Sequence, residues 1–159
     1  MSHIVRQREQ LSIRHVASGD LKHVRHIFER TTSEDRYCRF FQFKDELDDA
    51  ALLQFVDFGT GTVGLLAFDG ATPVGMAHAW VDEFGAAELG VIVSGDVRRR
   101  GVGLMLIESL LDELRARAVQ ELFAYALGEN AAFAALARRL GMTRQSVEDG
   151  VATFRLALA

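Results

Sequence analysis

A short glycine-rich segment, Arg98-Arg-Arg-Gly-Val-Gly103, lies between an apolar run and a long amphipathic segment. The run at 89–93 is typical of a buried strand, and the apolar residues of 104–117 recur at helical spacing. A turn between a strand and a helix directs backbone N–H groups to one point, where the first helical turn has unpaired donors and partial positive charge. The segment therefore predicts a phosphate-binding loop, with the arginines as further donors.

The positions of the glycines exclude two common phosphate-binding loops. A Walker A loop ends in Gly-Lys-Ser/Thr, but Gly103 is followed by Leu104. A dinucleotide fingerprint carries a third glycine at the position where Leu106 stands. An ordinary glycine-rich turn with surface arginines is the alternative, and the segment alone leaves both interpretations open.

Length and composition limit the class of protein. A chain of 159 residues, 49% apolar and 25% charged, suits one domain, which we place at 1–159 with a flexible N-terminal segment at 1–10. No apolar run reaches membrane-spanning length and the N-terminus lacks the apolar core of a signal peptide, so we expect a cytoplasmic protein without a membrane partner. A net charge of −4 without a broad basic face argues against nucleic-acid binding. The single cysteine, Cys38, excludes a cysteine-built zinc site, and the histidines form no metal-spaced pair, so we expect no metal. His23 and His26 are expected at the surface of the first helix.

The remaining periodicities predict strands alternating with helices. Strands are expected at 11–15, 63–69, 74–81, 87–93, 121–127, 142–147 and 151–158, and helices from residue 21 and at 45–55, 104–117 and 131–140. Asp149-Gly150 predicts a hairpin between the last two strands. This order indicates a mixed sheet with helices on both faces.

The pattern Arg-x-x-Gly-x-Gly between a strand and a helix resembles the acetyl-CoA pyrophosphate loop of the GNAT superfamily of N-acetyltransferases. The order of elements matches the GNAT fold along nearly the whole chain, and two local features agree. Val91-Ile-Val93 resembles the strand whose backbone pairs with the pantetheine arm in that family. The run from Asn130 to Gly141 keeps the spacing of the family's Asn-x-x-Ala…Gly motif.

This resemblance implies a fold, a co-substrate and a set of binding residues. The fold would be α/β (α+β), with a central, mixed, mostly antiparallel twisted sheet of about seven strands flanked by four helices. The co-substrate would be acetyl-CoA. Its binding residues would be Val91, Ile92, Val93, Arg98, Arg99, Arg100, Gly101, Val102, Gly103, Leu104 and Asn130. Asn130 is also expected to be the N-cap of the last helix.

A narrower resemblance concerns the segment 32–41, which reads Thr-Ser-Glu-Asp-Arg-Tyr-Cys-Arg-Phe-Phe. Together with the pair Ala87-Glu88, it resembles bacterial protein-lysine acetyltransferase domains. The resemblance implies that Tyr37 to Phe41 forms a wall of the acceptor site, whereas simple packing between two helices is the alternative. Trp80 is a second candidate for that wall, with burial in the core as its alternative.

Transfer to an amine requires a base, because a lysine side chain with a pKa near ~10.4 is protonated at neutral pH. Glu88 is the expected base, since it is the one carboxylate in the strand before the loop and lies on the opposite face from Leu89 and Val91 by simple alternation. Tyr125, on the next strand, is the second catalytic candidate. For both residues the alternative is a structural role without chemistry. The family's general-acid tyrosine is replaced by Ala137, which cannot donate a proton.

These features predict an N-acetyltransferase that moves an acetyl group from acetyl-CoA to a primary amine by direct transfer in a ternary complex. The acceptor stays open between a small molecule and a protein lysine. Ala137 favours one alternative, a catalytically silent acyl-CoA-binding regulatory module, and a loop that holds a different phosphate ligand is another. The C-terminal hairpin adds a homodimer as a further expectation.

Overall fold

The structure is a computed structural model that describes residues 4–31, 48–97 and 101–159, without the side chain of Asp96. Its strands are β1 (Ile4–Arg8), β2 (Leu11–His15), β3 (Thr62–Asp69), β4 (Thr72–Val81), β5 (Ala86–Val93), β6 (Glu121–Leu127), β7 (Thr143–Glu148) and β8 (Val151–Ala157). Its α-helices are α1 (Leu21–Glu29), α2 (Asp49–Leu52), α3 (Val102–Ala116) and α4 (Ala131–Leu140), and its short 3-10 helices are η2 (Leu53–Phe55) and η3 (Gly95–Val97).

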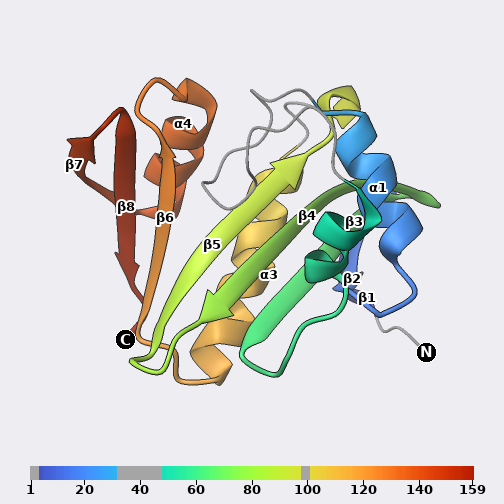
Figure 1. The fold of residues 1–159 in the computed structure, drawn as a ribbon, viewed down its shortest axis with the longest axis horizontal. Coiled ribbons are helices and arrows are strands. Elements are labelled where there is room, and N and C mark those ends of the chain that lie inside the picture. Colours follow the sequence, from blue (N-terminus) through green and yellow to red (C-terminus); the bar gives the residue numbers. More distant parts are fainter. Residues whose placement is uncertain (1–3, 32–47, 98–100) are drawn as a thin grey trace.

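All eight strands belong to one sheet with the order β1-β2-β3-β4-β5-β6-β8-β7 (Figure 1). Every neighbouring pair is antiparallel except β5 and β6, which run parallel. The connection between these two strands is α3, as a parallel pair requires a crossover. The predicted mixed, mostly antiparallel sheet is therefore confirmed.

The helices cover opposite faces of the sheet. A Cβ added to Gly75 of β4 would lie 3.1 Å from Leu106 and 3.2 Å from Val102, so α3 lies closely against this face. On the other face, Phe55 of η2 contacts the rings of His78 and Trp80 from the same strand, and it also packs on α1. Side chains alternate along a strand, so odd and even positions of β4 meet different helices. Four α-helices thus flank the sheet within the described residues, as predicted.

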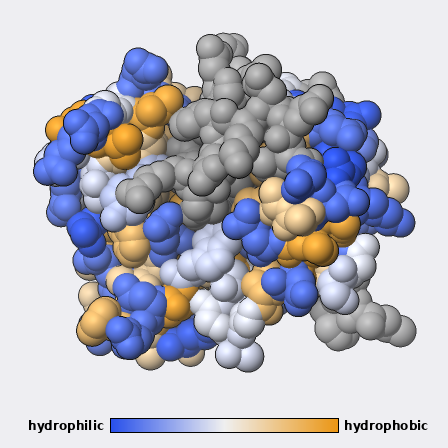
Figure 2. Space-filling model, in the orientation of Figure 1, coloured by the Kyte–Doolittle hydropathy of each residue, from blue (hydrophilic) through white to orange (hydrophobic). Residues whose placement is uncertain are grey.

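Burial follows from this layering. Nearly every residue of β3, β4 and β5 is buried, because helices cover these central strands on both sides. The strand β6 alternates between buried and half-buried residues, and all residues of the edge strand β7 are exposed. Figure 2 shows the face that carries η2, where hydrophobic residues form only small areas among hydrophilic ones on the visible described surface.

The structure corrects three expectations. The sheet has eight strands rather than seven, because residues 4–8 of the segment expected to be flexible form β1, which pairs with β2. The described part of the helix expected at 45–55 is a four-residue α-helix followed by a 3-10 turn. His23 and His26, expected at the surface of α1, are both half-buried, and the ring of His23 packs 5.2 Å from that of Phe68.

None of the helices in the described ranges combines the length and the apolar character that crossing a membrane requires.

Candidate functional site

The N-terminus of α3 carries both glycines of the predicted phosphate loop. Gly101 is the N-cap and adopts φ 77° and ψ 17°, a left-handed conformation that favours glycine. Gly103 lies in the first turn, where an added Cβ would stand 3.4 Å from Leu136 and 3.6 Å from Val93. The helix therefore begins at the place where α3, α4 and β5 come together.

A cavity of about 480 Å³, which we call the loop cavity, opens at this place. Five of the predicted cofactor-binding residues line it together with residues of α4: Val93, Gly101, Val102, Gly103 and Leu104 from the loop side, and Ala132, Ala135, Leu136 and Arg139 from α4. Its walls are mostly apolar, and one end is the N-terminus of a 15-residue helix. This combination suits a diphosphate attached to a long, largely apolar chain. Arg98, Arg99 and Arg100 lie outside the described residues.

The strands β5 and β6 pair only at their beginning. Their register runs from Ala86 opposite Glu121 to Glu88 opposite Phe123 and then ends, although both strands continue. Figure 1 shows the two backbones diverging beyond this point. The second half of β5, which includes the predicted residues Val91 and Ile92, therefore does not pair with β6. A backbone edge released in this way can pair with an extended ligand.

The predicted base stands where the two strands part. Glu88 is directly opposite Trp80 on one side and Phe123 on the other, so the three side chains share one face of the sheet. That face is the one that carries η2, because Trp80 packs on Phe55. Glu88 is half-buried, whereas Val91, on the α3 face, is fully buried. The predicted separation of Glu88 from the apolar stripe is thus present in the fold.

The second catalytic candidate lies across the same gap. Tyr125 is two residues beyond Phe123 on β6 and therefore shares the face of Glu88. Its ring meets the ring of Phe123 at 5.6 Å in an edge-to-face arrangement. Trp80 is half-buried and stacks on His78 at 5.3 Å, so it is neither a core residue nor a fully exposed one. The segment 32–41, predicted to flank this face, lies outside the described residues.

The helix α4 supplies no proton donor from its buried side. Asn130 is its N-cap, as expected, since the side-chain oxygen accepts a hydrogen bond of 3.0 Å from the backbone N–H of Phe133. The two buried residues of α4 are Phe133 and Ala137. Ala137 is 1% exposed and packed in the core, so its position offers neither a proton donor nor access to solvent.

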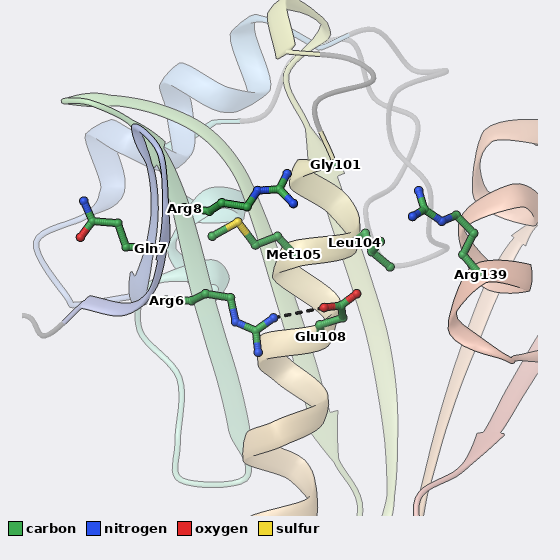
Figure 3. A pocket seen from close by; sticks show the side chains of 8 residues that line it. All are labelled: Arg6, Gln7, Arg8, Gly101, Leu104, Met105, Glu108 and Arg139. Carbon is green, nitrogen blue, oxygen red and sulfur yellow. Dashed lines mark hydrogen bonds and ion pairs between the residues drawn. The ribbon is translucent and has the colours of Figure 1, made fainter.

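A second cavity, of about 510 Å³, lies on the other side of the start of α3 (Figure 3). We call it the arginine cavity, because its described lining includes Arg6 and Arg8 of β1 and Arg139 of α4. Gly101, Leu104 and Arg139 line both cavities, so the two are adjacent. The sequence did not single out these arginines. Arg6 and Arg8 alternate ahead of Leu11 and Ile13, but the sequence predicts a flexible segment over 1–10.

A buried histidine lies beneath the face of Glu88. His78 is fully buried, and this burial lowers its pKa to about 4, so the ring is neutral at neutral pH. Its Nε2–H donates a hydrogen bond of 2.9 Å to the backbone oxygen of Phe55. The ring therefore joins β4 to η2 and supports Trp80 from below.

No group of three or more histidine, cysteine, aspartate or glutamate side chains in the described part of the chain is placed to hold a metal ion.

Comparison with known proteins agrees with this geometry. The model of the acetyltransferase (GNAT) family matches residues 22–142, which include the loop, β5, β6 and α4. The ribosomal protein bS18-alanine N-acetyltransferase of Salmonella typhimurium is 35% identical over 83 residues, which make up 52% of this chain and 55% of that protein. The match thus spans about half the length of this curated relative.

Solved structures show the same fold. The GNAT domain of S. lividans PAT superposes with a TM-score of 0.84 at 22% identity, over 99% of this chain and 96% of that one. The protein yncA from Salmonella typhimurium, solved with its cofactor acetyl-CoA, superposes with a TM-score of 0.72 at 20% identity, over 95% of each chain. The glycine loop at the start of α3, the parting of β5 and β6 and the family match all agree, and the chain belongs to the GNAT family of acetyltransferases.

Proposed function

We propose that the chain transfers an acetyl group from acetyl-CoA to a primary amine, by direct attack in a ternary complex. The observation that carries this proposal is the continuity of three features. The start of α3 forms one end of the loop cavity. The second half of β5, which does not pair with β6, leads away from this cavity, and Glu88 lies where β5 and β6 part. A diphosphate, an extended arm and a reacting thioester need these features in this order.

The chemistry assigns a role to each part. The amine nitrogen attacks the thioester carbonyl carbon, the C–S bond breaks, and CoA leaves as a thiolate. Glu88 takes the proton that the amine loses, directly or through a water, because an ammonium group cannot attack. Backbone N–H groups around Val91 stabilise the oxygen that gains charge. Since Ala137 cannot protonate the thiolate, either Tyr125 serves as the acid or the thiolate leaves unassisted.

The acceptor is proposed to be an amine carried by a protein. The curated relative is named for acetylating an alanine of a ribosomal protein, and the 22%-identical solved domain supports the fold alone. A protein acceptor would bring either a lysine side chain or an N-terminal α-amine. The α-amine has a pKa near ~7.7–8.0, so it demands less of the base than lysine does.

The test is a set of transfer assays with purified protein. Acetyl-CoA is combined with peptides that carry a free N-terminus, a free lysine or neither, and CoA release is measured together with acetylated peptide. Release of CoA that depends on one class of amine supports the proposal. The alternative, an acyl-CoA-binding module without catalysis, is favoured by Ala137; it predicts saturable acetyl-CoA binding without CoA release across the whole panel.

A cytoplasmic location and a homodimer formed through the C-terminal hairpin remain part of this proposal. Light scattering across a concentration series, with Arg144→Glu in the exposed strand β7 as a comparison, tests the dimer.

A further inference from the structure

Most of the charged side chains in the described lining of the arginine cavity are arginines. Its described lining includes three guanidinium groups and the single carboxylate of Glu108, and it adjoins the positive end of the α3 dipole. Arg6 pairs with Glu108 at 3.2 Å and with Asp112 at 2.7 Å. Within the described lining, the charged side chains besides this ion pair are those of Arg8 and Arg139.

The strand β1 places Arg8 at the start of α3. Arg6 and Arg8 face Ile13 and Leu11 of β2 in the register, and both of these partners are buried in the core. The two arginines therefore project toward the α3 side of the sheet. The ion pairs of Arg6 hold β1 against the middle of α3, and Arg8 lies further along, at the N-terminus of the helix (Figure 3).

The guanidinium group of Arg8 lies close to Gly101 of the glycine loop. A Cβ added to Gly101 would lie 3.4 Å from Arg8 Nη2. Gly101 is the N-cap of α3, so this guanidinium stands beside the helix end at which a diphosphate is proposed to bind. A guanidinium group and the N-terminus of a helix both attract an anion that is placed between them.

Coenzyme A has two ends that must leave the diphosphate in different directions. Its acyl end follows the loop cavity toward the parting of β5 and β6. The ribose carries a 3′-phosphate monoester, a group of charge near about −2 at neutral pH. The arginine cavity shares Gly101, Leu104 and Arg139 with the loop cavity, so it is the adjoining space that the nucleotide end can reach.

We propose that Arg8, together with Arg139, binds the 3′-phosphate of coenzyme A and selects it over carriers that lack this group. The inference rests on the proposed function, because it takes acetyl-CoA as the donor. It assigns a binding role to β1, outside the glycine loop. Guanidinium groups suit this role, since their planar donors match phosphate oxygens in pairs.

The experiment is a binding cycle measured by isothermal titration. Wild type, Arg8→Ala, Arg139→Ala and the double variant are each titrated with CoA, with dephospho-CoA, which lacks only the 3′-phosphate, and with adenosine 3′,5′-bisphosphate. Arg138→Ala on α4 and Arg115→Ala on α3 are matched controls, because both arginines are exposed and neither lines the cavity. Circular dichroism checks that each variant is folded.

The expected result is selective. Wild type binds CoA about tenfold or more tightly than dephospho-CoA, and Arg8→Ala removes most of this ratio while its affinity for dephospho-CoA stays within about twofold. Arg8→Lys retains part of the ratio, because it keeps the charge but loses the paired donors. The ratio in wild type also falls as salt is raised.

Two other results are distinguishable. Equal affinity of wild type for CoA and dephospho-CoA, or an equal loss for both ligands in Arg8→Ala and in Arg139→Ala, overturns this inference and leaves the proposed function standing. Failure of wild type to bind either carrier overturns both.

Discussion

At the scale of single residues, Glu88 is the position at which we expect a substitution to lower catalysis without changing CoA binding. We expect Glu88→Gln to lower kcat by about 10²- to 10³-fold, because the amine then loses its proton acceptor. Its affinity for CoA should stay unchanged, since Glu88 lies on the sheet face opposite the start of α3. The measurement is steady-state transfer together with CoA titration. Glu83→Gln, in the exposed turn after β4, is the matched control.

A variant that kept full turnover would remove Glu88 from the mechanism. Loss of CoA affinity and turnover together would instead indicate that the substitution disturbs the sheet where β5 and β6 part, and the separation of roles proposed here would be wrong.

Residue roles were predictable from the sequence where the chemistry is local. Gly101 follows from the left-handed conformation that a glycine-rich turn requires, and Asn130 follows from the preference of asparagine for N-caps. The placement of Arg8 and Arg139 on one cavity could not be predicted in the same way, since the two residues are far apart in the chain and belong to different elements, β1 and α4. For Glu88, alternation along the strand gave the correct face but not its neighbours Trp80 and Phe123.

At the scale of elements, the start of α3 is the feature on which the proposed binding of CoA depends. We expect Gly103→Glu to abolish measurable CoA binding, because the added side chain enters the space between Leu136 and Val93 and brings a negative charge to the phosphate site. The measurement is CoA titration, with thermal unfolding to show that the fold is retained. Gly59→Glu is the matched control, because a Cβ there meets nothing within 4 Å.

Retention of CoA affinity in Gly103→Glu would count against the loop as the diphosphate site. A loss of affinity in Gly59→Glu as well would show that the added charge acts through the whole protein rather than through the site.

The elements themselves were largely predictable, since seven of the eight strands and the order of the helices follow from periodicity and turn residues. The sequence does not predict β1, because Arg6 and Arg8 occupy the inward-facing positions at which a strand is expected to carry apolar residues. Arg6 forms ion pairs with Glu108 and Asp112 of α3 instead of being buried in the core, and these partners are 102 residues or more away in the chain. A strand held in this way lacks the alternation of apolar residues by which a strand is predicted.

At the scale of the whole molecule, the buried His78 links folding to pH. Its pKa is about 4 in the folded protein and near 6.5 when exposed, so the unfolded chain binds more protons between these values. The free energy of unfolding should therefore be unaffected by His78 above about pH 6.5 and should fall as the pH is lowered, by about 3 kcal/mol at pH 4.

Urea unfolding at several pH values measures this contribution. His78→Gln keeps an N–H donor for the oxygen of Phe55 but does not titrate, so its stability should depend less on pH between 6.5 and 4 even if it is lower throughout. Equal slopes in wild type and His78→Gln would show that the ring is not buried in its neutral form.

The arrangement of the two substrates also belongs to the whole molecule. The proposed diphosphate site lies on the α3 and α4 side of the sheet, whereas Glu88 and Tyr125 lie on the side of η2, and the two sides meet where β5 and β6 part. Donor and acceptor can therefore be bound together, and we expect intersecting double-reciprocal lines when both concentrations are varied. Parallel lines would indicate an acyl-enzyme instead. The only cysteine of the chain is Cys38, outside the described residues, so Cys38→Ser would then lose turnover, whereas direct transfer predicts that this variant remains active.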